Sequence, residues 1–374
     1  MGISQNQIYL DYNATAPLRP EAAEAISSMF EMPSNPSSVH LHGRDARARL
    51  EIARTQVALL AGARPQDVIF TSGGTESNNM VLAGYQHIIT SAVEHDAVLA
   101  ACPDAYHLPV DRNGVVKLDQ IEAVLASLDQ TERSRTLVSV MAANNETGVI
   151  QPIAEIARLC ASHDVHIHSD MVQMAGKLPI NLIETGLDYI TLSAHKIGGP
   201  SGVGAVVTAP SRRPATLLKG GGQEQGRRSG TENMLGIIGF GAAAETACGQ
   251  LEDAQRLANW HRMAETNITD ACPEIEVIGG EVSRLANTSA FYLPAISSEM
   301  AVMGLDLRGL SISAGSACSS GKMKPSHVIE AMGMAEKAGH VIRVSSGWKT
   351  QKSDLMMLAD QLIHLYKQAS QFQC

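Results

Sequence analysis

Residues 68–78 read Val68-Ile69-Phe70-Thr71-Ser72-Gly73-Gly74-Thr75-Glu76-Ser77-Asn78 and predict a strand, a glycine turn and a helix in that order. Mostly β-branched and aromatic residues open the stretch, two glycines form the turn, and helical spacing continues to Leu82. A helix is also expected before this strand, because apolar residues recur at helical spacing over residues 50–60 and stop at Gly62. Helix and strand therefore alternate here.

The same alternation continues along the chain. Further strands are expected at 87–91, 136–142, 166–169, 189–193 and 203–207, with helices that include 118–128 and 153–163. Such alternation predicts a largely parallel sheet covered by helices. Beyond Leu251 the pattern changes to a long helix, short strands at 276–278, 288–293, 310–313 and 341–345, and helices near 299–305, from 325 and from 353. This second pattern predicts a smaller α+β domain.

Composition excludes several classes of protein. The chain has 374 residues, 38 acidic and 29 basic side chains, a formal net charge of −9 and 44% hydrophobic residues, as globular proteins have. The acidic balance argues against nucleic-acid binding, which needs clustered Lys and Arg. No apolar run approaches the roughly 20 residues of a membrane helix, and residues 1–7 do not resemble a secretory signal. We therefore expect a cytoplasmic protein that binds neither nucleic acid nor a membrane.

The cysteines predict free thiols, one of them exposed. Six cysteines are scattered without a CxxC pair, and Cys160 has the helical apolar context of a buried residue. Cys318 differs, because it lies within Ser313-Ala314-Gly315-Ser316-Ala317-Cys318-Ser319-Ser320-Gly321-Lys322, where no bulky apolar neighbour can bury it. Exposed free thiols are a liability unless they are used, so we expect Cys318 to be functional.

Three other segments could carry chemistry, because ligands bind where parallel strands end. Residues 72–78 suit either a phosphate or a plain tight turn. His166-Ile167-His168-Ser169-Asp170 has a metal-binding spacing and raises a metallohydrolase as the rival function, although Met171 stands where such hydrolases place a histidine. A function for Asp170 alone fits better. Lys196, in Ser193-Ala194-His195-Lys196, is either solvated or able to condense with a carbonyl cofactor.

Taken together, the motifs resemble those of the pyridoxal-phosphate-dependent cysteine desulfurases. The matching segments run nearly end to end: 9–15, 35–38, 71–78, Glu94-His95, 144–148, 193–196, 228–231 and 315–318. The resemblance implies the α/β fold of type I pyridoxal-phosphate transferases. It implies a large domain over 14–254 with a mainly parallel seven-stranded sheet, and a small α+β domain over 1–13 and 255–374 that carries the cysteine loop.

The resemblance also implies roles for the cofactor residues. Lys196 would bind pyridoxal 5′-phosphate covalently and move protons, Asp170 would pair with the ring nitrogen, and His95 would stack on the ring. Gln173 would hydrogen-bond the ring hydroxyl, and Asn145 would contact the side of the ring. The phosphate would be held by Gly74, Thr75, Ser193 and His195, with Thr231 reaching it from the other subunit of a homodimer. No metal is implied.

The implied reaction converts L-cysteine to L-alanine. Arg343 would grip the substrate carboxylate, Asn35 would assist, and Cys318 would take the sulfur as a persulfide. The sulfur would pass to an acceptor or iron–sulfur scaffold protein, as in the long-loop desulfurases of nitrogen fixation and iron–sulfur cluster assembly. The Arg-x-Gly-His-His-Cys pattern of the short-loop type is absent. An aminotransferase or selenocysteine lyase of the same cofactor class is the alternative, and Cys318 separates them.

The sequence departs from the family pattern in three places. Met171 and Gly74 each replace a common alanine, and Met171 is expected to crowd the face of the cofactor ring. The chain ends at Cys374, without the C-terminal extension with which housekeeping members dock their scaffold protein. The sulfur acceptor is therefore left open.

Overall fold

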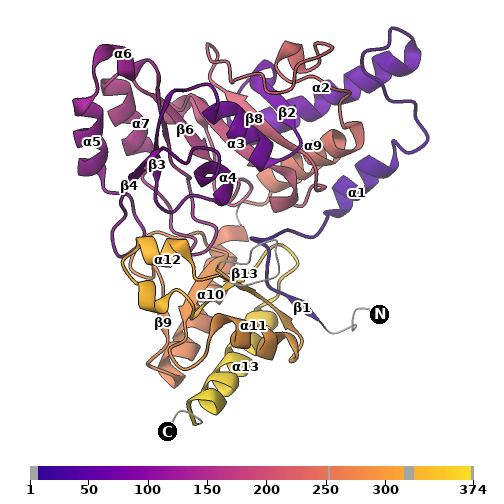
Figure 1. Ribbon diagram of the computed structural model, residues 1–374. Helices are drawn as coiled ribbons and strands as arrows, with labels where there is room; N and C mark the ends of the chain where they lie inside the picture. Colours follow the sequence, from indigo (N-terminus) through magenta and orange to yellow (C-terminus); the bar gives the residue numbers. More distant parts are fainter. Residues whose placement is uncertain (1–6, 252, 316–323, 372–374) are drawn as a thin grey trace.

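Strand β2 (Val68–Thr71) is a fully buried edge of the main sheet, as its apolar run predicts. The structure is a computed structural model that describes residues 7–251, 253–315 and 324–371. Its seven-stranded sheet follows the order β2, β8 (Gly204–Thr208), β7 (Tyr189–Ser193), β6 (His166–Asp170), β5 (Thr136–Ser139), β3 (His87–Ser91) and β4 (Tyr106–Leu108). The sheet lies in the upper body of the molecule (Figure 1).

The mainly parallel character of this sheet is confirmed, with one reversed strand. Strands β4, β3, β5, β6 and β7 run parallel, whereas β8 is antiparallel to both of its neighbours, β7 and β2. The connection from β7 to β8 holds only the short turn η2 (Ala194–Lys196). A parallel crossover needs a longer connection, usually a helix, so the chain turns back here.

Helices cover both faces of the sheet, because successive side chains of a strand point to opposite faces. On one face, β2 contributes Val68 and Phe70 to the largest apolar core. On the other, Ile69 packs with residues of α3 (Gly74–Leu82) and α4 (Asp96–Leu99). Helices that supply the first face include α1 (Pro20–Ser27), α2 (Leu41–Ala61), α5 (Leu118–Ser127), α7 (Ile153–Ser162), α8 (Leu182–Thr185) and α9 (Met234–Cys248). Helix α2 ends as expected, since Gly62 caps it with φ +60°.

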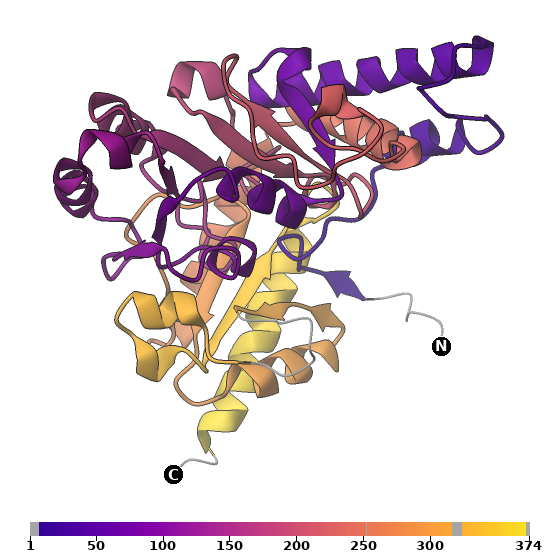
Figure 2. The same cartoon turned by 45° about the horizontal axis from the view of Figure 1, so that its top comes forward.

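The lower body has its own sheet and core (Figures 1 and 2). Its four-stranded sheet has the order β12 (Ser313–Ala314), β13 (Val341–Ser345), β10 (Thr288–Tyr292) and β9 (Glu276–Val277). Helices α10 (Asp253–Ala271), α11 (Ser298–Asp306) and α13 (Lys352–Gln371) pack around the second core, in which Phe291 and Ile342 are buried. The shorter helices elsewhere are η1 (Pro65–Asp67), α6 (Gln130–Arg133), η3 (Glu224–Gly226) and η4 (Ala335–Lys337).

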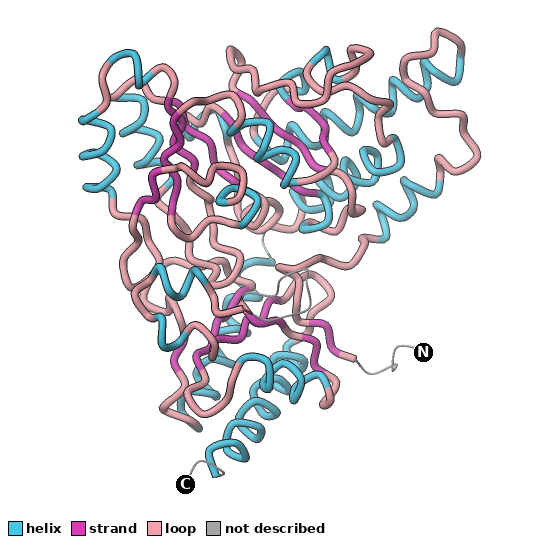
Figure 3. Tube along the Cα trace, in the orientation of Figure 1, coloured by secondary structure: helices cyan, strands magenta, loops and turns pink. Residues whose placement is uncertain are grey.

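Two segments pack against parts of the molecule that are remote in sequence. Figure 3 shows the two bodies coloured by secondary structure. The N-terminal strand β1 (Ile8–Tyr9) pairs in parallel with β11 (Leu310–Ser311), and Leu10 belongs to the second core. Conversely, α12 (His327–Ala331) places Val328 and Ile329 in the first core. The domain boundaries at residues 14 and 254 stay a prediction.

Cys160 is buried, as its helical apolar context predicts. The thiols of Cys102, Cys160 and Cys272 are buried and Cys248 is partly exposed, and none of these described cysteines forms a disulfide. Among the described residues, no helix combines the length and the apolar character needed to cross a bilayer.

A buried ion pair fixes the loop that follows β8. Arg54 of α2 and Glu224 lie 2.8 and 2.9 Å apart in a two-pronged contact, with side chains only 4% and 2% exposed. The same carboxylate accepts the Phe70 N–H at 2.9 Å, and Arg54 also donates to the Val68 carbonyl. The loop is thus tied to both α2 and β2.

Replacing Arg54 with methionine should lower the free energy of unfolding by about 3–5 kcal/mol, because Glu224 then stays buried without its cation. Urea unfolding followed by circular dichroism measures the change. Arg49→Met is the matched control on the same helix, since the Arg49–Asp45 pair is more than one-third exposed and should contribute less than about 1 kcal/mol. Equal effects of the two substitutions would contradict this prediction.

Candidate active site

A cavity of about 180 Å³ lies where β6 and β7 end and α3 and α4 begin. Strand carboxyl ends and helix N-termini converge there, as is typical of ligand sites in open α/β sheets. Most of the predicted site residues line it: Gly74, Thr75, His95, Asn145, Asp170, Gln173, Ser193, His195 and Lys196. The other lining residues are Asn78, Ala97, Met141 and Val172. The structure thus brings together residues that lie more than 100 positions apart in the sequence.

One end of the cavity suits an anion. Gly74 and Thr75 form the first turn of α3, where backbone N–H groups have no partner within the helix. Ser193 and His195 face the same cavity, and burial together with nearby Lys196 lowers the pKa of His195 to about 4. The His195 ring is therefore neutral at physiological pH and can act as a hydrogen-bond donor or acceptor.

Asp170 provides a carboxylate that is held rigidly. Its Oδ2 accepts a hydrogen bond from Asn78 at 2.7 Å, and its Oδ1 accepts the Val172 N–H at 3.0 Å. Only 6% of Asp170 is exposed. The Oδ1 atom of Asn78 is buried in the same place and has no hydrogen-bond partner among the described residues. Such an unpaired buried acceptor is typical of a site that pairs with a ligand.

His95 has a defined tautomer. It caps the N-terminus of α4, and its Nδ1 accepts the Ala97 N–H at 3.0 Å. In the neutral ring the proton is then on Nε2. The cavity therefore contains a histidine whose Nδ1 is occupied and whose Nε2–H can donate a hydrogen bond.

The side-chain amine of Lys196 has a lowered pKa. Its Nζ donates to the carbonyl oxygens of Asn13 and Ala14, the latter at 2.9 Å. Burial first, and then the positive charge of Arg343, lower its pKa to about 8. A substantial fraction of Lys196 is consequently neutral and nucleophilic near physiological pH.

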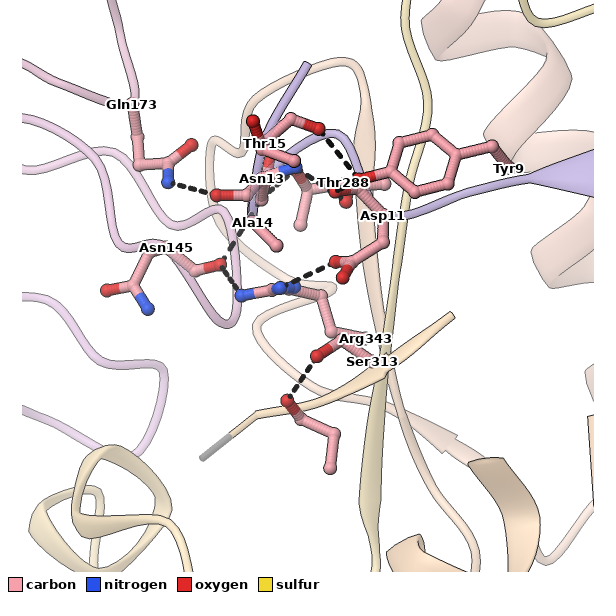
Figure 4. A network of polar contacts seen from close by, with 12 residues as sticks. Tyr9, Asp11, Asn13, Ala14, Thr15, Asn145, Gln173, Thr288, Ser313 and Arg343 are labelled. Carbon is pink, nitrogen blue, oxygen red and sulfur yellow. Dashed lines mark hydrogen bonds and ion pairs between the residues drawn. The ribbon is translucent and has the colours of Figure 1, made fainter. Parts of the chain in front are cut away.

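A network centred on Asn13 joins these side chains (Figure 4). The Asn13 carbonyl accepts from Lys196 and from Gln173 Nε2, the latter at 3.0 Å. Lys177 donates to Asn13 Oδ1 at 3.0 Å and to Gln173 Oε1 at 2.9 Å. Burial, together with Lys196 and Arg343, lowers the pKa of Lys177 well below its usual range. Sequence reasoning assigned no role to Asn13 or Lys177, although Asn13 lies in one of the motifs quoted above.

Arg343 lies beside the cavity rather than in its lining. One Nη atom donates to the Asn145 carbonyl at 3.0 Å and the other to Asp11 Oδ1 at 2.7 Å (Figure 4). The side chain is buried, and its Nε has no partner among the described residues. A guanidinium keeps its charge at all relevant pH values, so this unpaired donor can receive an anionic group.

Other predicted site residues lie elsewhere. Thr231 and Asn35 are exposed and outside the cavity of their own chain, and Asn35 Oδ1 accepts the Ser37 N–H at 2.9 Å. Cys318 lies outside the described residues. The expectation that Met171 crowds the cofactor ring is wrong, because Met171 is packed in the first core and Val172 lines the cavity.

The histidines of β6 do not support the metallohydrolase alternative. His168 is buried, and its two ring nitrogens lie 2.9 Å from Ser139 Oγ and 3.0 Å from Thr191 Oγ1. His166 Nδ1 lies 3.4 Å from Asp188. Within the part of the chain that the structure describes, no group of three His, Cys, Asp or Glu side chains could hold a metal ion. The histidines are therefore engaged structurally.

The family model described as "Aminotransferase class-V" matches residues 8–358, nearly the whole chain. The chain belongs to the class-V aminotransferase family. Cysteine desulfurase IscS of Dictyoglomus turgidum is 39% identical to it over 376 residues, covering 96% of this chain and 94% of that protein. The X-ray structure of the NifS-like protein from Rickettsia africae superimposes with a TM-score of 0.90 at 34% identity, covering 96% and 99% of the two chains. The structure named "SspA in complex with cysteine" matches with a TM-score of 0.75 at 29% identity, covering 90% and 98%.

This member of the class-V aminotransferase family is a pyridoxal 5′-phosphate enzyme, as its desulfurase relatives indicate. The residues present fit that cofactor. The amide-rich start of α3 suits its phosphate, Asp170 suits a protonated ring nitrogen, and Lys196 suits its aldehyde. Gly74 adds room, because a Cβ there would lie only 3.2 Å from Val172 Cγ2.

The lowered pKa of Lys196 predicts a pH dependence for cofactor uptake. In cofactor-free protein, the rate of pyridoxal 5′-phosphate attachment should rise with pH with a midpoint near 8, because only the neutral amine attacks an aldehyde. Stopped-flow absorbance between pH 6 and 10 measures the midpoint. Arg343→Gln should raise it, since a neighbouring positive charge is lost. A midpoint near the 10.5 of an ordinary lysine would rule the prediction out.

Proposed function

We propose that this enzyme is a cysteine desulfurase, which converts L-cysteine to L-alanine and passes the sulfur to an acceptor. The observation that carries the proposal is the gathering of Lys196, Asp170 and His95 in one cavity beside Arg343. Relatives named cysteine desulfurase, which match 96% of this chain at up to 39% identity, support it.

Lys196 holds the cofactor and moves protons. Its lowered pKa leaves the amine able to attack the cofactor aldehyde and, once released, to take a proton from the substrate α-carbon. Pyridoxal 5′-phosphate supplies an electron sink for that carbon when it is bound. Asp170 would pair with the ring nitrogen, and its carboxylate is held in place by hydrogen bonds from Asn78 and the Val172 N–H.

Arg343 orients the substrate. Its unpaired Nε and the remaining Nη hydrogens can bind the carboxylate of L-cysteine, and Asp11 and the Asn145 carbonyl fix the plane of the guanidinium. His95, with Nδ1 occupied by the Ala97 N–H, presents Nε2 for proton exchange. Gln173 retains one Nε2 hydrogen for the cofactor, since the other is donated to Asn13.

Cys318 takes the sulfur. Its thiolate attacks the sulfur of the bound substrate, so that an S–S bond forms as the substrate C–S bond breaks. The electron pair of that bond goes to the carbon, which is then protonated to give alanine. The acceptor is proposed to be a partner protein, with iron–sulfur cluster assembly as the destination of the sulfur, and a cytoplasmic location is part of the same proposal.

The enzyme is proposed to act as a homodimer with shared sites. Thr231 and Asn35 both lie outside the cavity of their own chain, and we assign Thr231 to the cavity of a second copy. Apolar side chains near Asn35 are strongly exposed, with Phe30 at 68%, Val39 at 88% and Leu41 at 67%. Exposed apolar surface of this kind is typical of a protein interface.

Cys318→Ala tests the sulfur chemistry. The variant should bind L-cysteine with an unchanged shift of the cofactor absorbance, because Lys196, Asp170 and Arg343 remain. Alanine release and enzyme-bound persulfide should fall by several orders of magnitude, as is usual for loss of a nucleophile. Cys248→Ala is the control and should leave both unchanged. Full desulfuration by Cys318→Ala would instead favour a β-eliminating lyase, and conversion of L-cysteine without loss of sulfur would favour the aminotransferase alternative.

A mixture of Lys196→Ala and Thr231→Ala protomers tests the shared site. Each protomer is deficient alone, but a mixed dimer regains one intact site if Thr231 serves the partner. After random exchange, about a quarter of the sites should be intact, because half of the dimers are mixed and each has one such site. Desulfuration assays and native mass spectrometry measure activity and exchange. Exchange without regained activity would contradict the crossing of Thr231.

A further inference from the structure

The turn Asn144–Gly148 connects the cofactor cavity to a second place in the molecule. Asn144 Oδ1 accepts the N–H groups of Glu146 and Thr147, each at 2.9 Å, and its Nδ2 donates to the Val93 carbonyl at 3.0 Å. The neighbouring Asn145 lines the cavity. The backbone of Glu146 is thus held rigidly next to the proposed substrate site.

The Glu146 carboxyl lies in a buried contact with the start of α12. Only 3% of Glu146 and 1% of Ser326 are exposed, and the Ser326 hydroxyl donates to Glu146 Oε2 at 2.5 Å. The same hydroxyl accepts the Ile329 N–H at 3.2 Å, so Ser326 also caps α12. Burial raises the pKa of Glu146, and the hydrogen bond from Ser326 opposes that rise. Burying a carboxyl away from water is costly, so packing alone does not explain why a glutamate stands at position 146.

The same carboxyl touches Gly315. A Cβ at position 315 would overlap Glu146 Oε2 and lie 3.7 Å from Ser326 Cβ, so only glycine fits without displacing Glu146. Gly315 follows β12 of the lower sheet, whereas Ser326 leads into α12, whose Val328 and Ile329 belong to the first core. Residues 315 and 326 flank the stretch that contains Cys318, and one carboxyl contacts both.

The residue after Ser326 is also tied to the catalytic side. His327 Nε2 lies 2.9 Å from the carbonyl oxygen of Glu94, the residue that precedes His95. Ser326 and His327, which follow the stretch that contains Cys318, therefore contact the upper body at Glu146 and at Glu94. Gly315, which precedes that stretch, has its close contact at Glu146.

We propose that Glu146 is a positioning residue for sulfur transfer, which holds Gly315 and Ser326 at a fixed distance from the cofactor cavity. This inference rests on the proposed function, because it assumes that Cys318 attacks the substrate sulfur. Glu146 does not line the cofactor cavity. Its effect should therefore appear when the S–S bond forms, and not when L-cysteine binds.

Glu146→Ala and Ser326→Ala test the proposal in the full-length holoenzyme. Each should slow persulfide formation and alanine release roughly ten- to hundredfold, the factor expected from one lost charge-assisted hydrogen bond. The rate and L-cysteine dependence of the cofactor absorbance change should stay within about twofold, because that step precedes sulfur transfer. Glu146→Gln retains an acceptor oxygen and should recover most of the rate. Ser297→Ala, which removes the equivalent cap of α11, is the matched control and should have wild-type rates.

A second test compares the effect of Gly315→Ala in the wild-type enzyme with its effect in Glu146→Ala. The substitution should slow sulfur transfer in the wild-type background and have little further effect in Glu146→Ala, because the overlapping oxygen is then gone. An additive effect, or an equal slowing of the absorbance change and of persulfide formation, would overturn the proposal. Failure of the proposed function gives a different result. In that case the wild-type enzyme would not form a persulfide that depends on Cys318.

Discussion

A buried amide must have its polar groups paired, and at Asn13 this requirement holds the molecule together. Asn13 is 1% exposed, and an unpaired group there would cost about 1–3 kcal/mol. Its backbone N–H donates to Ser345 and its side chain donates to Thr288, both in the lower body, while its carbonyl accepts Gln173 and Lys196 of the upper body. These pairings are compatible with one arrangement of the two cores, and that arrangement forms the site.

Three cations, Lys177, Lys196 and Arg343, lie close together at this junction. Lys177 and Lys196 donate to amide and carbonyl oxygens, and Arg343 pairs with Asp11. Buried amines lose protons more easily under these conditions, which explains the lowered pKa values of both lysines. Positive potential of this kind favours a substrate with a carboxylate and a cofactor with a phosphate, so the electrostatics of the fold and the proposed chemistry agree.

Local patterns predicted much of this fold, and remote pairings explain where prediction stopped. The bounds of β2, β7 and β13 were predictable because each is a buried β-prone run. Several cavity residues were predictable because the carboxyl ends of parallel strands lie at the same edge of the sheet. The place of Met171 was misjudged, since strand alternation puts Val172 on the side of Asp170. The apolar run of β8 does not encode its direction, which follows from the short connection between residues 193 and 204 that holds no α-helix. The contacts of Arg343 with Asp11 and of Glu146 with Ser326 join residues 332 and 180 positions apart, which no local pattern encodes.

The pairing of the two ends of the chain also affects how the protein is made. Strand β1 emerges from the ribosome long before its partner β11 and before the Arg343 that pairs with Asp11. At about 5–20 residues per second, the 332 residues between Asp11 and Arg343 take roughly 15–65 s to synthesise. The upper body has its strands and helices complete well before that. A nascent chain can therefore fold its large sheet early, whereas Arg343 reaches Asp11 and Asn145 beside the cavity only after residue 343 has been synthesised.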